Sequence, residues 1–242
     1  MALLEQVPDP RHRRGVRHRL AAILAVGLTA VIAGSRSFAA IGEWAAELDP
    51  TVLGDLGAGG RGPPSEATIR RAFTALDGDR LDKLIGAWMR TRVGLLAGRH
   101  VIAIDGKTVR GAKTAGSTAP HLVAALDHTA GVVLDQVQVA RESNEIPALR
   151  TLLDAFDLFT RVVTADAMPT QTATATYDNF VRGGQYVFTV NANQPGLYRR
   201  CKALPWAQLR ATSSVDRTHT RPVRRTIKVA AAPQILDFPH AD

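Results

Sequence analysis

The spacing of apolar residues changes near position 100, and this change limits what the chain can fold into. Before it, apolar residues recur at the three-to-four residue spacing of amphipathic helices, whereas after it they come in short runs of Val, Leu and Ile that are typical of strands. The helices expected before it span residues 20–32, 38–48, 69–76 and 81–93. The sequence therefore predicts a helical N-terminal part followed by an α/β part.

The second part has a definite order of elements. Its expected strands are 101–104, 121–126, 132–139, 161–165 and 186–190, with helices at 146–156 and about 171–181. Residues 127–131 suit a hairpin turn, and Asn144 can cap the helix after it. This order is that of the ribonuclease-H-like fold, in which the first and fourth strands are parallel neighbours. We expect an α/β chain with a ribonuclease-H-like mixed sheet and flanking helices, preceded by a small all-helical domain.

Two aspartates stand at the polar ends of buried runs in this order. Asp105 follows residues 101–104, and Asp166 follows residues 162–165. If the two strands are neighbours, about 4.8 Å apart, two carboxylates at their ends can share a divalent cation. Magnesium held there would suit phosphoryl transfer.

Plainer roles for these residues stay open. An Asp before Gly at a strand end is often a turn residue, and an Asp before a helix is often an N-cap. Phosphatases of the haloacid dehalogenase type carry Asp-x-Asp-Gly-Thr after the first strand, but Ala103 and Lys107 occupy the leading Asp and the Thr positions here. The pair in this order of elements favours the metal site.

The charge of the chain favours a polyanionic partner. Its 242 residues carry a formal net charge of +8 and a pI near 10.3, and nucleic acid is the commonest such partner, although a basic protein without one is the alternative. Residues 199–228 hold nine Lys and Arg against the single acid Asp216. That density suits DNA backbone; a segment left unfolded is the other interpretation.

The N-terminal half adds smaller signals. Ser65 is a predicted N-cap, with Glu66 favouring the helix dipole. Arg70 and Arg71 on that helix are candidates for phosphate contacts, with a solvated face as the alternative. Residues 20–35 after a run of arginines imitate a secretory signal, but the stretch is too short to span a membrane, and a buried first helix explains it better. The single Cys201 excludes an intramolecular disulfide and fits a reducing compartment.

Several short motifs in a fixed order resemble the DDE transposases of bacterial insertion sequences, in the ISAs-type or H-repeat-associated branch. The resemblance covers nearly the whole chain. Its motifs are residues 9–11, 64–71, 105–111, 121–123, 143–146, 164–168 with Gln171, and the pair Asn193 and Gln194.

The resemblance implies the chemistry and the partners. Asp105 and Asp166 match the first two acids of the family's catalytic triad and would bind Mg2+ (or Mn2+). The reaction would be cleavage at element ends and transfer of a 3′-hydroxyl to target DNA. The protein would be a homo-oligomer on double-stranded DNA, with no membrane role, in the bacterial cytoplasm at the nucleoid. Lys107, Arg110, Asn193 and Gln194, with Arg70 and Arg71, are the expected DNA contacts, surface solvation being the alternative for the first two.

The third acid of the family is a Glu on a late helix, and no Glu follows Glu145. Glu145 itself begins a helix, where capping is the more natural role. We therefore expect domains at 1–96, 97–194 (an incomplete catalytic core) and 195–242 (the start of a basic insertion region), a C-terminal truncation, and impaired catalysis. A departure at Asn191, where the family has Lys, removes a possible phosphate contact. The alternative is a non-catalytic DNA-binding remnant or a regulator of the intact enzyme.

Overall fold

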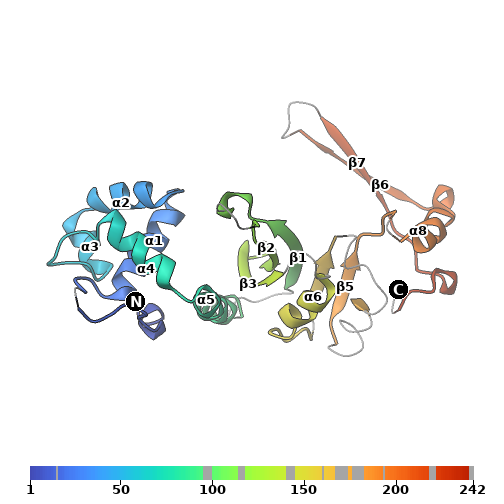
Figure 1. Cartoon of the computed structure of the whole chain (residues 1–242). Helices are drawn as coiled ribbons and strands as arrows, with labels where there is room; N and C mark the ends of the chain where they lie inside the picture. The colour runs from blue at the N-terminus through green and yellow to red at the C-terminus, as the bar shows by residue number, and fades with distance from the viewer. Residues whose placement is uncertain are drawn as a thin grey trace. The chain divides into compact units, whose positions relative to one another are not determined.

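The computed structural model describes most of the chain. The described residues are 1–14, 16–94, 100–113, 118–139, 145–159, 161–166, 174–175, 183–192, 194–217 and 222–239. The chain divides into two compact units, Met1–Gly94 and Leu95–Asp242, drawn in blue to cyan-green and in green to red in Figure 1. The three-part division at residues 96 and 194 stays a prediction.

The first unit is helical and is built around one central helix. Its elements are η1 (Leu4–Gln6), α1 (Leu20–Ile32), α2 (Phe38–Ala46), α3 (Pro50–Asp55), α4 (Glu66–Ala75) and α5 (Gly78–Val93). Helix α1 is buried along most of its length, with Ile23, Leu24 and Val26 fully inaccessible. It packs against η1, α2 and α4 (Figure 1). Its uncharged run is thus explained by burial, as expected, and none of the described helices is long and apolar enough to cross a membrane.

Polar caps set where these helices begin. The Ser65 hydroxyl accepts a hydrogen bond from the Thr68 N–H, which confirms the predicted cap. Helix α3 lies between two of the helices expected from the sequence and is not one of them. The signal was present: Asp49 accepts a hydrogen bond from the Thr51 N–H at 2.8 Å, and Pro50 occupies the first helical position, where proline is tolerated.

The second unit contains a five-stranded mixed sheet in the order β3-β2-β1-β4-β5. Its strands are β1 (Val101–Thr108), β2 (His121–Asp127), β3 (Val132–Val139), β4 (Val162–Ala165) and β5 (Gln185–Phe188). Strands β1, β2 and β3 pair antiparallel, whereas β4 pairs parallel with both β1 and β5. This is the predicted ribonuclease-H-like arrangement.

Strand β1 is longer than predicted, and this changes the position of Asp105. The antiparallel register with β2 continues through Gly106↔Val123 to Thr108↔His121. Asp105 therefore lies inside β1 and is not a turn residue. The Asp105-Gly106 pair reads locally as a turn, but the ladder to β2 supplies backbone partners that hold it extended.

One face of the sheet carries the core of this unit. Helix α6 (Glu145–Leu153) packs on β2 and β3. The buried side chains include Ile102, Val123 and Val163 from the sheet, with Leu149, Leu152, Leu153, Phe156 and Leu158 from α6 and the segment after it. The predicted cap Asn144 and most of the helix predicted at 171–181 lie outside the described residues; within the latter, Thr174 and Ala175 are helical and buried.

The basic segment after β5 is folded where the structure describes it. It forms α8 (Pro195–Lys202), η4 (Trp206–Gln208) and a hairpin of β6 (Ala211–Asp216) and β7 (Val223–Lys228), followed by η5 (Gln234–Leu236). Figure 1 shows the hairpin as a two-stranded ribbon, and nearly all its residues are exposed. The described part of this segment is thus ordered in the structure and not an unfolded tail.

The contact between α2 and α4 depends on a glycine, which gives a first prediction. A Cβ on Gly42 would lie 2.8 Å from the Glu66 Cβ and 3.2 Å from its Cα, closer than real atoms approach. Gly42→Ala should push the two helices apart and destabilise the first unit by about 1–3 kcal/mol, the usual cost of overpacking. Hydrogen exchange of α2 and α4 amides measures this.

The matched control is Gly54→Ala in α3, where an added Cβ meets nothing within 4 Å. Because alanine is the better helix former, this change should be neutral or stabilising by up to about 1 kcal/mol. Equal stability of the two variants would contradict the close contact between α2 and α4.

Candidate active site

The parallel pairing of β1 and β4 places the two predicted acids at equivalent positions. The register runs from Val101↔Val162 to Ile104↔Ala165, and Asp105 and Asp166 are each the next residue. Adjacent strands lie about 4.8 Å apart. Although 61 positions separate them in the sequence, the two backbones are neighbours at this edge of the parallel ladder.

Asp105 lies on the sheet face opposite the α6 core, and Asp166, the residue after β4, is expected on the same face. Ile104 and Ala165, one residue earlier on each strand, are buried, and side chains alternate between faces along a strand. Asp105 and Asp166 are both exposed. The neighbour of Asp105 on β2 is the small residue Ala124.

Lys107 lies on the same strand as Asp105. It lies two residues beyond Asp105 on β1 and is exposed, so it faces the same side of the sheet about 6–7 Å further along the strand. Arg110 lies just beyond the strand in η2 (Arg110–Ala112). The site thus combines two hard oxygen donors with a cationic side chain.

The donor set fits a divalent cation. Two Asp carboxylates are the ligands that Mg2+ takes from a protein, with water and substrate phosphate completing its shell. Among the residues that the structure describes, no group of three or more His, Cys, Asp or Glu side chains is placed to hold a metal ion. The described site therefore offers two protein ligands.

A buried acid near β1 was not identified from the sequence. Asp127 is fully inaccessible; its Oδ2 lies 2.9 Å from His100 Nδ1, and its Oδ1 accepts the Ala130 N–H at 2.7 Å. It pairs with Ile102, so it lies toward the opposite end of β1 from Asp105 and on the opposite face. Its partners make it a structural residue that closes the β2–β3 turn.

The electrostatics of Asp127 follow from these contacts. Burial acts to raise the pKa of its carboxyl, but hydrogen bonds from the Ala130 N–H and the His100 ring outweigh burial and hold the pKa of Asp127 below its ordinary value. The signal for this pair was weak, because Asp127 begins a sequence that also suits a turn and His100 lies 27 positions away.

The other predicted DNA contacts that the structure describes belong to elements other than β1 and β4. Gln194 is the residue before α8, where its backbone carbonyl accepts the Tyr198 N–H at 2.9 Å; Asn193 lies outside the described residues. Arg70 and Arg71 belong to α4 of the first unit. The Arg70 guanidinium pairs with Glu66 and lies over the Phe38 ring, 5.3 Å from its centroid, so Arg71 is the better candidate of the two.

Comparison with known proteins is consistent with this geometry. Residues 96–232 match the family model described as Transposase DDE domain, and residues 1–89 match the model DDE_Tnp_1-associated. "Putative transposase YncI" of Escherichia coli K12 is 35% identical over 79% of this chain and 77% of its own length. "H repeat-associated putative transposase YhhI" of the same strain is 31% identical over 78% of this chain and 50% of its own.

These matches identify the family of the chain. The sheet is ribonuclease-H-like, and its paired acids lie in the segment matched by a transposase domain. The chain belongs to the DDE transposase family and is similar to its H-repeat-associated members. DDE domains use divalent metal ions. The chain spans about half the length of several of the curated relatives.

A solved transposase is more distantly similar. The piggyBac transposase synaptic complex with hairpin DNA gives a TM-score of 0.43 at 12% identity over 89% of this chain and 54% of that chain. A similarity of that degree adds no argument about the site.

The buried pair of His100 and Asp127 gives a second prediction. Because the pKa of Asp127 is lowered by folding, its contribution to stability is present above the unfolded value of about 3.9 and is lost as the pH falls through the folded pKa. Asp127→Asn should remove this contribution at neutral pH, at a cost of about 1–3 kcal/mol. Hydrogen exchange of β2 and β3 amides at several pH values measures the effect.

The exposed Asp79 in α5 serves as the control, and Asp79→Asn should leave exchange in β2 and β3 unchanged. If the β2 and β3 amides exchanged as slowly in Asp127→Asn as in the parent chain at pH 7, the proposed structural role of Asp127 would be wrong.

Proposed function

We propose that this chain carries the catalytic acids of a DDE transposase that cleaves DNA at the ends of an insertion element and joins a 3′-hydroxyl to target DNA. The observation that supports the proposal most is the β1–β4 register, which ends one residue before Asp105 on β1 and one residue before Asp166 on β4. Membership of the family supports the class of reaction.

Each residue has a role in this proposal. Asp105 and Asp166 would hold the divalent cation, Mg2+ or Mn2+, between neighbouring strands. Bound there, such an ion supplies charge neutralisation at phosphate and activation of an attacking hydroxyl. Lys107, on the same face, would contact the scissile phosphate and orient it. The ladder of β1 against β2 and β4 would hold Asp105 and Lys107 in position, and Asp166 directly follows β4.

The sequence offers no late Glu to serve as the third acid of the site. No Glu follows Glu145 in the sequence, and Glu145 lies at the start of α6. With two carboxylates, the cation is held less firmly and the reacting groups are placed less accurately. We therefore propose that these 242 residues alone catalyse strand transfer weakly.

The partner would be double-stranded DNA, both element ends and target, bound by an oligomer of the chain at the nucleoid in the bacterial cytoplasm. The net charge of +8 supports a DNA partner. The exposed β6–β7 hairpin supports it further: Arg224, Arg225 and Lys228 lie on it, and Asp216, its one acid, is 3.7 Å from Arg225.

A second candidate function is a non-catalytic DNA-binding regulator that occupies element ends. The same basic hairpin favours it, because phosphate contacts need neither aspartate. The two candidates differ in metal dependence: binding by the regulator would persist without Asp166.

The metal site gives a third prediction. Asp105→Asn and Asp166→Asn should each weaken Mn2+ binding by about 10- to 100-fold, since loss of even an outer-shell partner costs that much. Mn2+-dependent nicking of supercoiled plasmid should fall at least as far. Electron paramagnetic resonance of free Mn2+ measures the binding without relying on activity.

Asp154→Asn, which removes an exposed acid just after α6, is the control and should change neither quantity. Full Mn2+ affinity in the Asp105 and Asp166 variants would refute the metal site. Loss of Mn2+ binding with unchanged nicking would show that another nuclease is responsible for the activity.

A further inference from the structure

A concave basic surface lies on the first unit, whereas the two aspartates belong to the second. It is a cleft of about 430 Å³ between the segment before α1 and the first turns of α4. We call it the arginine cleft, and its polar lining includes Arg11, His12, Arg14, Arg17, Ser65 and Arg71. Four of these six side chains are guanidinium groups, which present forked N–H donors to oxyanions.

The acids near the cleft are already paired. Asp9 forms a bidentate contact with Arg11, at 2.8 Å for each oxygen, and Glu66 pairs with Arg70 on the next turn of α4. Among the described residues, no carboxylate forms an ion pair with Arg14, Arg17 or Arg71. The cleft therefore keeps an uncompensated charge of about +3 from these three arginines.

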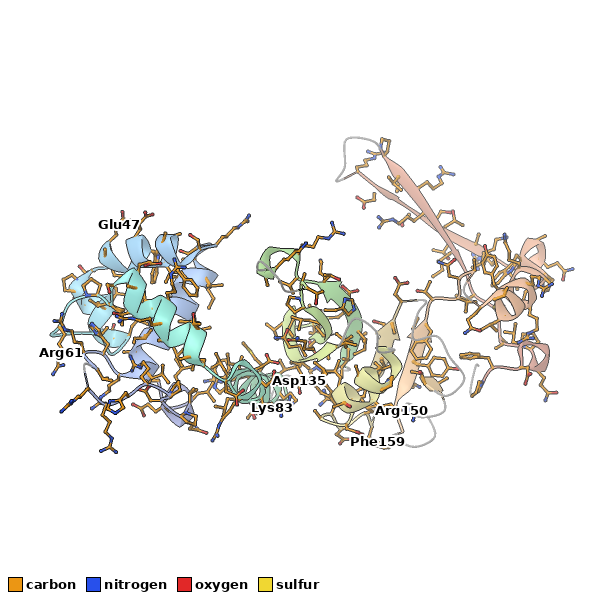
Figure 2. All side chains as sticks on the ribbon, in the orientation of Figure 1. Glu47, Arg61, Lys83, Asp135, Arg150 and Phe159 are labelled. Atoms are coloured by element: carbon orange, nitrogen blue, oxygen red, sulfur yellow. The ribbon has the colours of Figure 1, made fainter. Side chains whose placement is uncertain are left out.

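The nearby arginines also affect the pKa of a neighbouring histidine. Burial lowers the pKa of His18, and the charges of Arg61, Arg11 and Arg17 lower it further. Arg61, on the loop after α3 (Figure 2), lines a second hollow of about 340 Å³ that shares Val16 and Arg17 with the cleft. The cationic surface thus extends over both hollows.

Hydrogen bonds from arginine side chains to backbone carbonyls hold the cleft in shape. The Arg11 guanidinium donates to the His18 carbonyl at 3.0 Å, and Arg61 donates to the Arg17 carbonyl at 3.1 Å. Arg71 Nε donates to the Ala67 carbonyl at 3.0 Å, which orients its guanidinium and leaves the terminal nitrogens available. Such preorganisation lowers the entropic cost of binding a ligand.

We propose that the arginine cleft binds the phosphodiester backbone of duplex DNA through Arg14, Arg17 and Arg71. The identification of the polyanion as DNA rests on the proposed function; the need for an anion rests on the unpaired arginines and the concave shape. The Ser65 hydroxyl already caps α4, so the arginines supply the binding. This site holds DNA on the first unit independently of metal at Asp105 and Asp166.

The test is DNA binding by the full chain in EDTA, so that metal plays no part. A fluorescent random-sequence duplex is titrated with the parent chain and with the triple variant Arg14→Gln, Arg17→Gln, Arg71→Gln, at several salt concentrations. Each phosphate contact contributes about 0.9 to the slope of log K against log salt. For the triple variant, the magnitude of this slope should be smaller by about 2–3. Its affinity for the duplex near 0.1 M salt should be about 100-fold lower or more.

The matched control removes the same charge elsewhere on the first unit. Arg36, Arg80 and Lys83 are exposed and do not line the cleft, so their triple Gln variant should change affinity by only a few fold. Equal losses in both triple variants would overturn the proposal, because general charge would then explain binding. So would stronger competition by single-stranded RNA of the same length than by unlabelled duplex.

The outcomes separate this inference from the catalytic proposal. An affinity insensitive to the cleft variant, together with Mn2+ binding that depends on Asp105, would refute the cleft and leave the metal site intact. Unchanged hydrogen exchange in α1 and α4 of the triple variant shows that weaker binding reflects lost contacts and not a lost fold.

Discussion

The parallel pairing of β1 with β4 is the interaction on which the rest of the second unit depends. Parallel neighbours cannot be joined by a tight hairpin, so the chain must leave the sheet and return. It leaves through the β2–β3 hairpin and α6, which covers one face with leucines. The face opposite that core carries Asp105, and Asp166 follows directly after β4. One pairing thus fixes both the core and the place of the acids.

The second unit has one buried structural acid and two exposed candidate ligands. Asp127 is buried, paired with His100 and surrounded by N–H donors, so it stabilises the start of β1 and the β2–β3 turn. Asp105 and Asp166 are exposed at the other end, where a cation and a phosphate can reach them. Burial and hydrogen bonding therefore distinguish a structural carboxylate from candidate ligands that look similar in the sequence.

The sequence predicted most of this because the strongest patterns are local. Residues 20–32 and 132–139 were found at their observed bounds, since an uncharged helix and a Val-rich run are set by their own side chains. The part of strand β1 beyond Asp105 is not predicted by the sequence, because Gly106 and Lys107 are held extended by their pairing with β2. His100 contacts Asp127 across 27 positions, and Arg14 and Arg71, 57 positions apart, line one cleft; no local pattern reports such arrangements. The metal site itself stays a prediction, although the neighbouring strands that it requires are present.

The most direct test of the juxtaposition of Asp105 and Asp166 is a disulfide between cysteines placed at the two positions. In a Cys201→Ser background, Asp105→Cys with Asp166→Cys should form a disulfide on mild oxidation, because in-register neighbours have Cα atoms within the 4.4–6.8 Å that a disulfide spans. Asp105→Cys with Thr164→Cys, offset by two residues on β4, should not. A disulfide in the offset pair and none in the in-register pair would contradict the proposed juxtaposition of Asp105 and Asp166.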